Sequence, residues 1–597
     1  MKFGIDRPSK LFQHWEQPVP AWTLSIIWIC LISFVAFIWH LGSIGLVDET
    51  EPLFAEAARQ MTETGDWITP YFNGATRFDK PPLIYWLMAI AYQTIGVNEW
   101  AVRLPSALAA IALTTMGFYT LKQFGFPSPA AAETATVPNS PHKTSRQRWL
   151  GAWIGAAMMA LNTHTIVWAR TGVSDMLLSG CMGIALLAFF CGYAQPARPQ
   201  VQARWYLAFY VLSALAVLTK GPVGIVLPVL IIGAFLLYVG NGWTVLREMR
   251  LLRGGLIFLA IAVPWYILVI QANGQEYIDN FFGYHNFERF TEVVNRHDAP
   301  WYFYFFAVLV GFAPWSLYLP VAIARLRIWQ RTHWQQQPRA THLGLFASSW
   351  LLIIFSFFTI AVTKLPSYVL PLMPAAAILV ALLWSEQITR QQISRSVLIT
   401  GIVNTIFLVA LAGAVLYSPN WLGDDPTMRN LPEVIRQSGL LPWGAASWAI
   451  AAIIMLVLLL RRQGRWLWLV NFMGFFAFIV FAVMPAFSVV DSLRQLPLRQ
   501  LSETMVQAQQ PQEMLTMLGF QKPSLVFYTE RPILFISDPD DLEEQLDQLF
   551  EQNTPSVLMV AFPHKLREAD LEPEQYQLVE QAGAYQLIRI QLPLKEN

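Results

Sequence analysis

The chain has 597 residues, of which 55% are hydrophobic and only 13% are charged, and its net charge is +1. Many apolar runs are about 17 to 23 residues long, the length that crosses a bilayer core of roughly 30 Å. This composition excludes a soluble globular protein, and the near-zero net charge gives no reason to expect nucleic acid as a partner. The sequence therefore predicts a polytopic α-helical membrane protein.

Apolar runs predict about 13 transmembrane helices. They lie near residues 21–41, 103–121, 149–169, 175–194, 205–219, 222–240, 254–271, 301–323, 342–361, 366–385, 396–417, 441–460 and 466–487. The first run is too long for the hydrophobic part of a signal peptide, so we expect a retained helix. The three cysteines, Cys30, Cys181 and Cys191, lie inside apolar runs and are interpreted as small hydrophobic residues.

One further apolar segment, residues 82–96, has about fifteen residues and opens with two prolines. If it does not cross and the N-terminus is cytoplasmic, the cytoplasmic segments hold 21 of the 40 Lys and Arg residues. If it crosses, every later loop changes side and the positive-inside bias reverses. We therefore expect a re-entrant or surface-lying helix, an odd number of spans, and a C-terminal region outside the cytoplasm.

Polar residues gather at or just beyond the outer ends of the predicted spans. They are Asp48, Glu49, Lys80, Arg103, Arg170, Asp175, Lys220, Glu288, Arg289, Lys364 and Tyr368. The middle of the predicted spans contains no Asp, Glu, Lys or Arg. A charge at the bilayer centre costs about 2.5–3.5 kcal/mol, which pumps and transporters accept along their pathways. The chemistry of this chain is therefore expected at the outer surface.

The first outer loop, residues 42–102, follows the first span. Thr50 can cap an amphipathic helix that Gly65 ends, with Asp48 and Glu49 at its start, either as capping groups or as reactive carboxylates. Lys80 precedes two prolines that hold its backbone extended, so its ammonium is either a phosphate ligand or an interfacial anchor.

The composition becomes that of a soluble protein near Asp491, and we place a domain boundary between residues 1–488 and 489–597. The later part predicts a small α/β domain. Its expected strands are residues 524–530, 532–536, 556–562 and 585–592, and its expected helix is 541–552.

Several motifs of the outer loops carry a resemblance to a known family. They are Asp48-Glu49-Thr50, Gly65-Asp66-Trp67, Phe78-Asp79-Lys80-Pro81-Pro82-Leu83, residues 98–106, Arg170-Thr171-Gly172-Val173-Ser174-Asp175, Thr219-Lys220-Gly221-Pro222, residues 285–290, 299–302 and 364–368. Residues 20–385 thereby resemble the 4-amino-4-deoxy-L-arabinose lipid A transferases (ArnT-like). These belong to the protein mannosyltransferase-like (PMT superfamily, GT-C) integral-membrane glycosyltransferases. The later spans and the C-terminal domain match only in general layout.

The resemblance implies a GT-C fold and a transferase that takes a sugar from a polyprenyl-phosphate carrier such as undecaprenyl phosphate. The acceptor would lie outside the cytoplasm and could be a lipid A-type glycolipid, a protein hydroxyl or a cell-surface glycan. A bacterial cytoplasmic (inner) membrane location follows, with no nucleic-acid partner. No cofactor is required, and a divalent metal is possible but not favoured. The absence of a phosphate-binding glycine loop or Rossmann fingerprint agrees with a donor that is not a nucleotide sugar.

The resemblance also assigns roles to residues. Asp48 is expected to act as general base or to orient the acceptor, with Asp175 and Glu49 as further carboxylates. Lys80 and Arg289 would hold the carrier phosphate. Further candidates around the lipid headgroup are Lys220, Lys364 and Tyr368, whereas His285 is either a site residue or an interfacial packing residue. Arg103 is expected to tie the first outer loop to the second span.

Two other classes of function stay open at this point. A polytopic lipid or sugar transporter would move its substrate without changing the acceptor covalently. A non-catalytic polysaccharide assembly protein would tolerate a conservative change such as Asp48→Asn.

Overall fold

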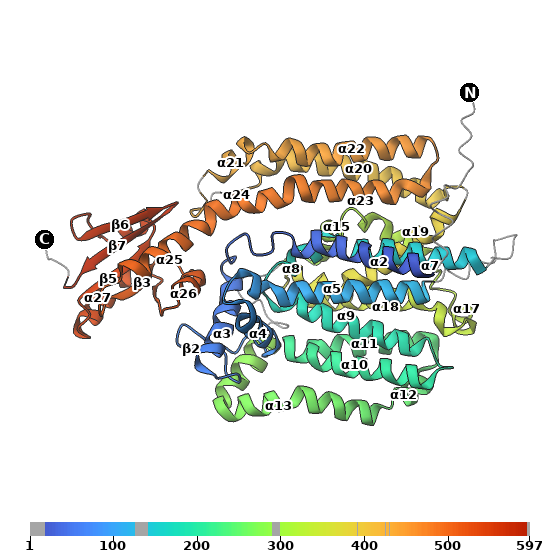
Figure 1. The fold of residues 1–597 in the computed structure, drawn as a ribbon, viewed down its shortest axis with the longest axis horizontal. Coiled ribbons are helices and arrows are strands. Elements are labelled where there is room, and N and C mark those ends of the chain that lie inside the picture. Colours follow the sequence, from blue (N-terminus) through green and yellow to red (C-terminus); the bar gives the residue numbers. More distant parts are fainter. Residues whose placement is uncertain are drawn as a thin grey trace.

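The computed structural model describes residues 18–125, 141–288, 299–390, 392–423, 425–428 and 430–593. Long helices lie side by side in a bundle, and a smaller α/β domain projects from one end (Figure 1). Helix α2 (Pro18–Ser33) begins at the opposite end. The two ends of the described chain thus lie at opposite ends of the bundle.

The bundle and its outer loops contain the following elements in chain order. They are α2 (Pro18–Ser33), η2 (Phe34–Ile38), α3 (Thr50–Thr64), β1 (Tyr71–Phe72), β2 (Ala75–Thr76), α4 (Leu83–Ile95), α5 (Glu99–Phe124), α7 (Pro141–Ala160), α8 (Thr163–Ala169), α9 (Ser174–Tyr193), α10 (Pro199–Lys220), α11 (Val223–Val239), α12 (Gly242–Glu248), α13 (Leu251–Tyr277), η3 (Ile278–Glu288), α15 (Phe303–Gly311), η4 (Ser316–Tyr318), α16 (Leu319–Ala324), α17 (Arg331–Gln336), η5 (Arg339–Thr341), α18 (Leu343–Ile360), η6 (Pro366–Leu372), α19 (Met373–Thr389), α20 (Arg395–Tyr417), η7 (Ser418–Asn420), α21 (Leu431–Gln437), α22 (Leu440–Leu460), η8 (Gly464–Trp466), α23 (Leu467–Phe478), η9 (Ile479–Val483) and α24 (Met484–Arg494).

Among the described residues, ten helices are long and apolar enough to cross a membrane, or up to twelve if each of two bent pairs is one span. The bent pairs join α7 to α8 at 59° and α15 to α16 at 114°. Helix α11 is apolar but has only 17 residues. The polytopic helical fold is confirmed, whereas the exact count of 13 spans, which includes α11, stays a prediction.

Burial separates the centre of the bundle from its lipid-facing side. In α9 and in the segment Pro366–Thr389, 94% of the apolar window is buried, compared with 17% in Leu251–Gly283. A helix that is apolar all round and almost fully buried belongs at the centre, while one that is apolar and exposed faces lipid. The N-terminal end of α9 and the segment before α19 are therefore held firmly at the end of the bundle that carries the C-terminal domain.

The doubtful apolar segment forms the 13-residue helix α4. At 1.5 Å per residue it spans about 20 Å, which is too short to cross the bilayer core. It lies with α3 at the end of the bundle next to the C-terminal domain (Figure 1). This arrangement agrees with the predicted short helix of the first outer loop. Helix α3 ends at Gly65 as predicted, with φ of 74°, but it begins at Thr50 itself, and the expected side-chain cap is not formed.

The C-terminal domain follows α24, from which Gln495 separates its first helix. It contains α25 (Leu496–Ala508), β3 (Met514–Leu518), α26 (Pro523–Thr529), β4 (Leu534–Ile536), η10 (Pro539–Asp541), α27 (Leu542–Glu551), β5 (Ser556–Ala561), α28 (Pro563–Glu568), β6 (Tyr576–Ala582) and β7 (Tyr585–Gln591). The strand order is β4-β3-β5-β7-β6. Strand β3 is parallel to β4 and β5, and β7 is antiparallel to β5 and β6.

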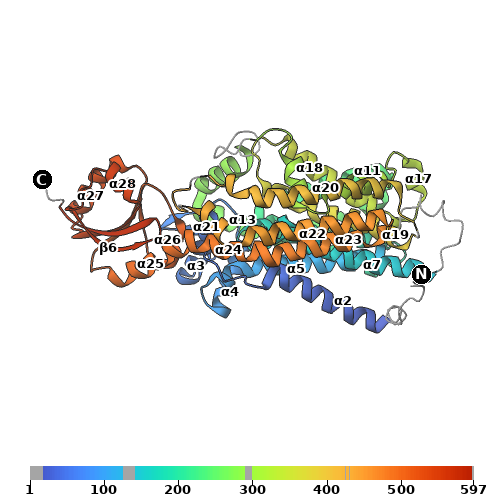
Figure 2. The same cartoon turned by 90° about the horizontal axis from the view of Figure 1, so that it is seen from above.

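Both faces of this sheet are covered. On one face Leu558 and Val560 of β5 join residues of α25 and α26 in a buried cluster. On the other face Val557 and Met559 join residues of α27 and α28. A strand buried on both sides has a continuous apolar sequence, which explains why SVLMVA was recognisable as a strand. Figure 2 shows the sheet between its helices.

One predicted strand is wrong. Residues 524–529 lie in helix α26 (Pro523–Thr529), and strands β3 and β6 were not predicted. Pro523 occupies the first turn of α26 and Glu530 ends it with a positive φ of 55°. Almost every residue of this segment is buried, so its apolar pattern shows neither a two-residue nor a 3.6-residue period. The predictions of β4, β5, β7 and α27 are confirmed.

Candidate functional site

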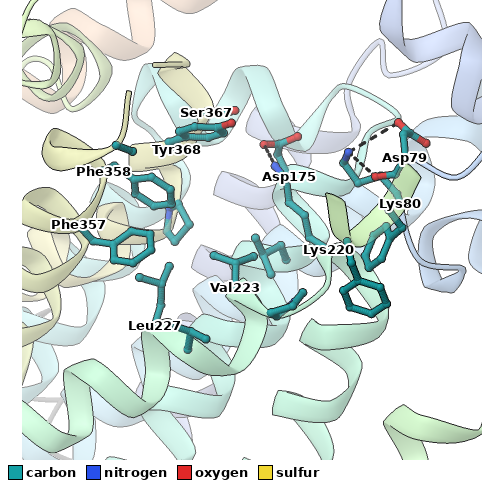
Figure 3. Close-up of a pocket in the computed structure, with 17 residues that line it drawn as sticks. Asp79, Lys80, Asp175, Lys220, Val223, Leu227, Phe357, Phe358, Ser367 and Tyr368 are labelled. Carbon is teal, nitrogen blue, oxygen red and sulfur yellow. Dashed lines mark hydrogen bonds and ion pairs between the residues drawn. The ribbon is translucent and has the colours of Figure 1, made fainter. Parts of the chain in front are cut away.

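A cavity of about 440 Å³ lies at the border between the bundle and the first outer loop. The described residues that line it are Asp79, Lys80, Asp175, Leu178, Lys220, Pro222, Val223, Val226, Leu227, Phe281, Phe282, Phe357, Phe358, Ala361, Ser367, Tyr368 and Pro371. Figure 3 shows the polar members gathered along one side, whereas Val223, Leu227 and Phe357 extend away from them along an apolar wall. The cavity is thus amphipathic.

Asp175 and Lys220 form an ion pair at the polar side. Asp175 lies in the first turn of α9 and Lys220 is the last residue of α10, positions where the helix dipoles favour an anion and a cation respectively. The Lys220 Nζ donates to Asp175 Oδ1 at 2.7 Å, and the two side chains are only 19% and 15% exposed. Ser367 also hydrogen-bonds Asp175, and Lys220 Nζ lies 5.7 Å from the ring centre of Tyr368. The ammonium is therefore held in one place.

Lys80 enters the same cavity from the first outer loop. Its Nζ donates to the backbone carbonyl of Asp79 at 2.7 Å and lies 3.7 Å from Asp79 Oδ2. Asp79 in turn accepts from Arg77 at 2.6 Å and from the Tyr85 hydroxyl at 2.9 Å. These contacts fix the lysine beside the prolines that start α4. The structure thus brings Lys80, Lys220, Asp175 and Tyr368 together around one cavity.

A buried ion pair connects the loops that carry these residues. Arg103 of α5 donates to Glu51 of α3 at 2.8 and 2.9 Å, and both side chains are 1% exposed. Arg103 also donates to the carbonyls of Leu41, Ile44 and Gly45, so it ties the first outer loop to α5 as expected from the sequence.

Glu51 also bridges the first two outer loops. It accepts from the backbone N–H of Gly172 at 2.6 Å and from that of Val47 at 2.8 Å. Gly172 lies three residues before Asp175, and Val47 precedes Asp48. One carboxylate therefore sets the relative position of the two segments that carry the predicted site carboxylates.

Asp48 does not line the cavity that contains Asp175. Seventeen described residues line the cavity, and Asp48 is not one of them. Its side chain is buried under the C-terminal domain, where Oδ1 accepts from the Ser524 backbone N–H at 3.0 Å and Oδ2 from the Ser524 hydroxyl at 2.5 Å. Burial raises the pKa of Asp48 to about 6, although Ser524, Lys522 and Arg494 act in the opposite direction. A carboxylate with this pKa exchanges its proton near neutral pH.

The remaining predicted residues lie at varied positions. Glu49 is mostly exposed, and Lys522 Nζ lies 3.6 Å from its carboxylate. Lys364 donates to the carbonyls of Thr359 and Ala361 at 3.1 and 2.6 Å, and burial lowers its pKa. Its ammonium binds its own loop, next to the cavity-lining Ala361. Arg289 and the side chain of His285 lie outside the described part of the chain.

Sequence reasoning did not single out Glu51, Ser367 or Ser524. Glu51 follows Asp48-Glu49-Thr50 in an acidic run, and that run was its only local signal. Ser367 lies in the motif of residues 364–368 but was given no role, and Ser524 carries no local signal because Asp48 is 476 positions away. Within the described residues, no group of three or more His, Cys, Asp or Glu side chains could hold a metal ion. The polar side chains that line the cavity are those of Asp79, Lys80, Asp175, Lys220, Ser367 and Tyr368.

Family models match two parts of the chain. The model for dolichyl-phosphate-mannose-protein mannosyltransferases matches residues 79–141, which begin at the Asp79–Lys80 wall of the cavity. The model for the C-terminal domain of cyanobacterial RgtA-type glycosyltransferases matches residues 508–597. The first match includes Asp79 and Lys80 of the cavity, and the second includes the sheet of the C-terminal domain.

Similar proteins extend these matches along the bundle. An uncharacterized protein of Aquifex aeolicus is 31% identical over 357 residues, which are 59% of this chain and 71% of the relative. An undecaprenyl phosphate-α-4-amino-4-deoxy-L-arabinose arabinosyl transferase of Shewanella sediminis is 27% identical over 71% of this chain and 70% of the relative. The crystal structure of ArnT from Cupriavidus metallidurans bound to undecaprenyl phosphate superposes with a TM-score of 0.74 at 21% identity, covering 97% of this chain and 100% of that one. The fold of the chain is therefore that of ArnT, C-terminal domain included.

Proposed function

Because the chain belongs to the ArnT-like, protein mannosyltransferase-type family of integral-membrane glycosyltransferases, we propose that it transfers a sugar from undecaprenyl phosphate or a similar polyprenyl phosphate to an acceptor outside the cytoplasm. The observation that carries this proposal is the amphipathic cavity. Two fixed lysines, Lys80 and Lys220, lie at its polar side, and phenylalanine and aliphatic side chains line the rest. A phosphate attached to a hydrocarbon chain matches both parts.

The transfer step needs the charges that the cavity offers. An acceptor hydroxyl oxygen attacks the sugar carbon, the bond from that carbon to the carrier phosphate oxygen breaks, and the polyprenyl phosphate leaves with the extra negative charge. Lysines placed at the phosphate stabilise that charge as it develops. Lys80 and Lys220 take this role in the proposal, with Arg289 as a third cation, while Asp175 and Tyr368 hold Lys220 in position.

Removal of the acceptor proton calls for a base that is ionised near neutral pH. We assign this role to Asp48, which the resemblance to the family identifies as the base and which lies at the start of the first outer loop. A pKa of about 6 agrees with this role, since it leaves the carboxylate mostly ionised at pH 7. Asp175 is less suited, since its carboxylate is already engaged by Lys220 and Ser367. Since phosphate is a good leaving group, no general acid is required.

The proposed orientation places the C-terminal domain outside the cytoplasm in a bacterial inner membrane. It rests on the positive-inside rule. Helices α12 and α17, in basic loops, lie at the end of the bundle opposite the C-terminal domain (Figure 1). The cavity and Asp48 lie toward the domain. This orientation separates the site from cytoplasmic nucleotide sugars.

A transfer assay tests the proposal. The purified protein is incubated in lipid vesicles with labelled undecaprenyl-phosphate-4-amino-4-deoxy-L-arabinose and a bacterial lipid and protein extract. Label is then measured in glycolipid, protein and glycan fractions. We expect covalent label in one fraction and release of free undecaprenyl phosphate. Label that only crosses the vesicle membrane, with every acceptor unmodified, would show a transporter instead.

Replacement of cavity lysines supplies the matched comparison. Lys80→Ala is expected to abolish transfer while the protein stays folded in the membrane. Lys565→Ala removes a lysine of the C-terminal domain that forms an ion pair with Glu568, three residues further along α28, and it is expected to retain transfer. Equal activity of the two variants would contradict the assignment of the cavity.

A further inference from the structure

The C-terminal domain and the first outer loop meet along a hydrogen-bonded seam. The Tyr528 hydroxyl accepts from the backbone N–H of Leu46 at 2.8 Å and donates to Glu99 at 3.0 Å. Asn73 exchanges two hydrogen bonds with the backbone of Ile533, at 2.8 and 2.9 Å. These contacts join residues more than 400 positions apart in the chain. The domain is thus docked on the loop that carries Asp48 and Lys80.

Asp48 lies within this seam and is 6% exposed. Both of its carboxylate oxygens accept hydrogen bonds from Ser524, at 3.0 Å from the backbone N–H and 2.5 Å from the hydroxyl. The amide of Gln495, oriented so that both of its atoms find partners, donates to Oδ2 at 3.2 Å and to the Leu46 carbonyl at 3.0 Å. Arg494 donates to the Asp48 backbone carbonyl at 3.4 Å. The carboxylate is therefore fixed in position and orientation by the C-terminal part of the chain.

From this geometry we propose that Ser524 is a positioning residue for Asp48, so that the C-terminal domain completes the reaction centre. This inference rests on the proposed function, in which Asp48 accepts the acceptor proton. A carboxylate has about four lone-pair positions, and the bonds from Ser524 and Gln495 use three of them, so one position is not engaged by these groups. Ser524 would then set which lone pair is presented, as the supporting groups of other catalytic bases do.

The groups around Asp48 determine in which direction its pKa should shift when the Ser524 hydroxyl is removed. Burial raises its pKa to about 6, whereas the Ser524 bonds and the positive charges of Lys522 and Arg494 favour the ionised form. Tyr585 of β7 faces the same region, and so does Asp425 from the loop after α20. Removing the Ser524 hydroxyl withdraws a stabilising bond from the carboxylate. The pKa of Asp48 should rise further, and the base should be lost at a higher pH.

The test is the pH profile of kcat for sugar transfer, measured with labelled undecaprenyl-phosphate aminopentose in vesicles. In the wild-type protein we expect the acidic limb to have its midpoint near the Asp48 pKa of about 6. In Ser524→Ala the midpoint should move up by about 1 pH unit or more, since a hydrogen bond to a charged group contributes about 1.5–3 kcal/mol. Ser524→Thr, which keeps the hydroxyl, should restore the wild-type midpoint. The donor KM should change little in both variants.

Asn73→Ala is the matched control. It removes a side chain from the same seam but one that bonds Ile533 rather than Asp48. If Ser524 only helps to dock the domain, Asn73→Ala and Ser524→Ala will lower activity alike and leave the midpoint unmoved. That result overturns the inference. A shift confined to Ser524→Ala supports it.

Two further outcomes keep the inference testable. Should Ser524→Ala fail to fold, Lys522→Met removes a positive charge that favours the same carboxylate and should move the midpoint in the same direction. A well-folded Lys522→Met protein with the wild-type midpoint would show that Asp48 does not determine the acidic limb of the profile. In that case Ser524 cannot act through Asp48, and the inference is overturned. Absence of transfer from any polyprenyl-phosphate donor by the wild-type protein would instead overturn the proposed function.

Discussion

Lys220 shows how much one side chain depends on its partner. Its ammonium lies 2.7 Å from Asp175, and both side chains are more than four-fifths buried. Because the two charges balance, the polar side of the cavity gains a fixed cation without an isolated buried charge. The effect of replacing Lys220 therefore has two parts, the loss of a cation at the phosphate and the release of an unpaired carboxylate.

A double-mutant cycle separates these parts. Lys220→Met should reduce transfer by roughly 10²–10³-fold or more, because it removes a charge that stabilises the leaving phosphate and leaves Asp175 to repel it. Asp175→Asn in the same chain should restore part of that loss by neutralising the carboxylate. The measurement is the transfer rate at low donor concentration for the wild type, both single variants and the double variant. If the fold-loss of the double variant equals the product of the two single fold-losses, Lys220 and Asp175 are not coupled and the prediction is contradicted.

At the scale of elements, Arg103 and Glu51 hold three segments in place. The pair connects α5, the start of α3 and the loop before α9, and Arg103 adds bonds to three backbone carbonyls. Each group at this junction has a partner that would be left buried and unpaired if the other were removed. The junction thus fixes the positions of α3, α5 and the loop before α9 relative to one another.

Breaking this junction should destabilise the protein strongly. Arg103→Ala is expected to lower the free energy of unfolding by about 3–5 kcal/mol, because it leaves the Glu51 carboxylate buried without its cation. Arg436→Ala, which breaks an ion pair whose side chains are 48% and 56% exposed, should change it by less than about 1 kcal/mol. Thermal unfolding in detergent, followed by tryptophan fluorescence, compares the two variants. Similar melting temperatures of the two variants would show that the Arg103–Glu51 pair contributes little to stability.

At the scale of the whole molecule, the chain has one end that carries the cavity and one basic end. The cavity, the first outer loop and the C-terminal domain lie toward one end of the bundle, and α12 and α17 lie at the other (Figure 1). Fixing the membrane orientation of either end therefore fixes that of the whole protein, the proposed site included.

Thiol labelling in intact cells tests this orientation. Cys30 is replaced first, since it is the exposed cysteine and Cys181 and Cys191 are buried. A membrane-impermeant reagent should then label Asp547→Cys on exposed α27 of the C-terminal domain without permeabilisation. Gln336→Cys, exposed in α17, should be labelled only after the inner membrane is opened. The reverse pattern would place the domain in the cytoplasm.

Local chemistry explains which parts of the site could be predicted from the sequence. Lys80 was recognisable because two prolines follow it, and α3 because its apolar spacing ends at Gly65, which takes the positive φ that glycine favours. Asp175 and Lys220 were each recognisable at the outer end of an apolar run. Their pairing was not, because nothing in the sequence tells which helix ends become neighbours.

The sequence by itself determined that this is a membrane protein with charges gathered at one border, because apolar length and charge placement are properties of the chain. It also identified the lysines and carboxylates of that border. Only the tertiary structure decided that Asp175 and Lys220 line a cavity with Lys80, and that Asp48 lies against Ser524, 476 positions away. It also decided that residues 524–529 are helical. The physical reason is the same in each case, since pairing and burial between distant segments depend on how they pack and leave no period or motif in the local sequence.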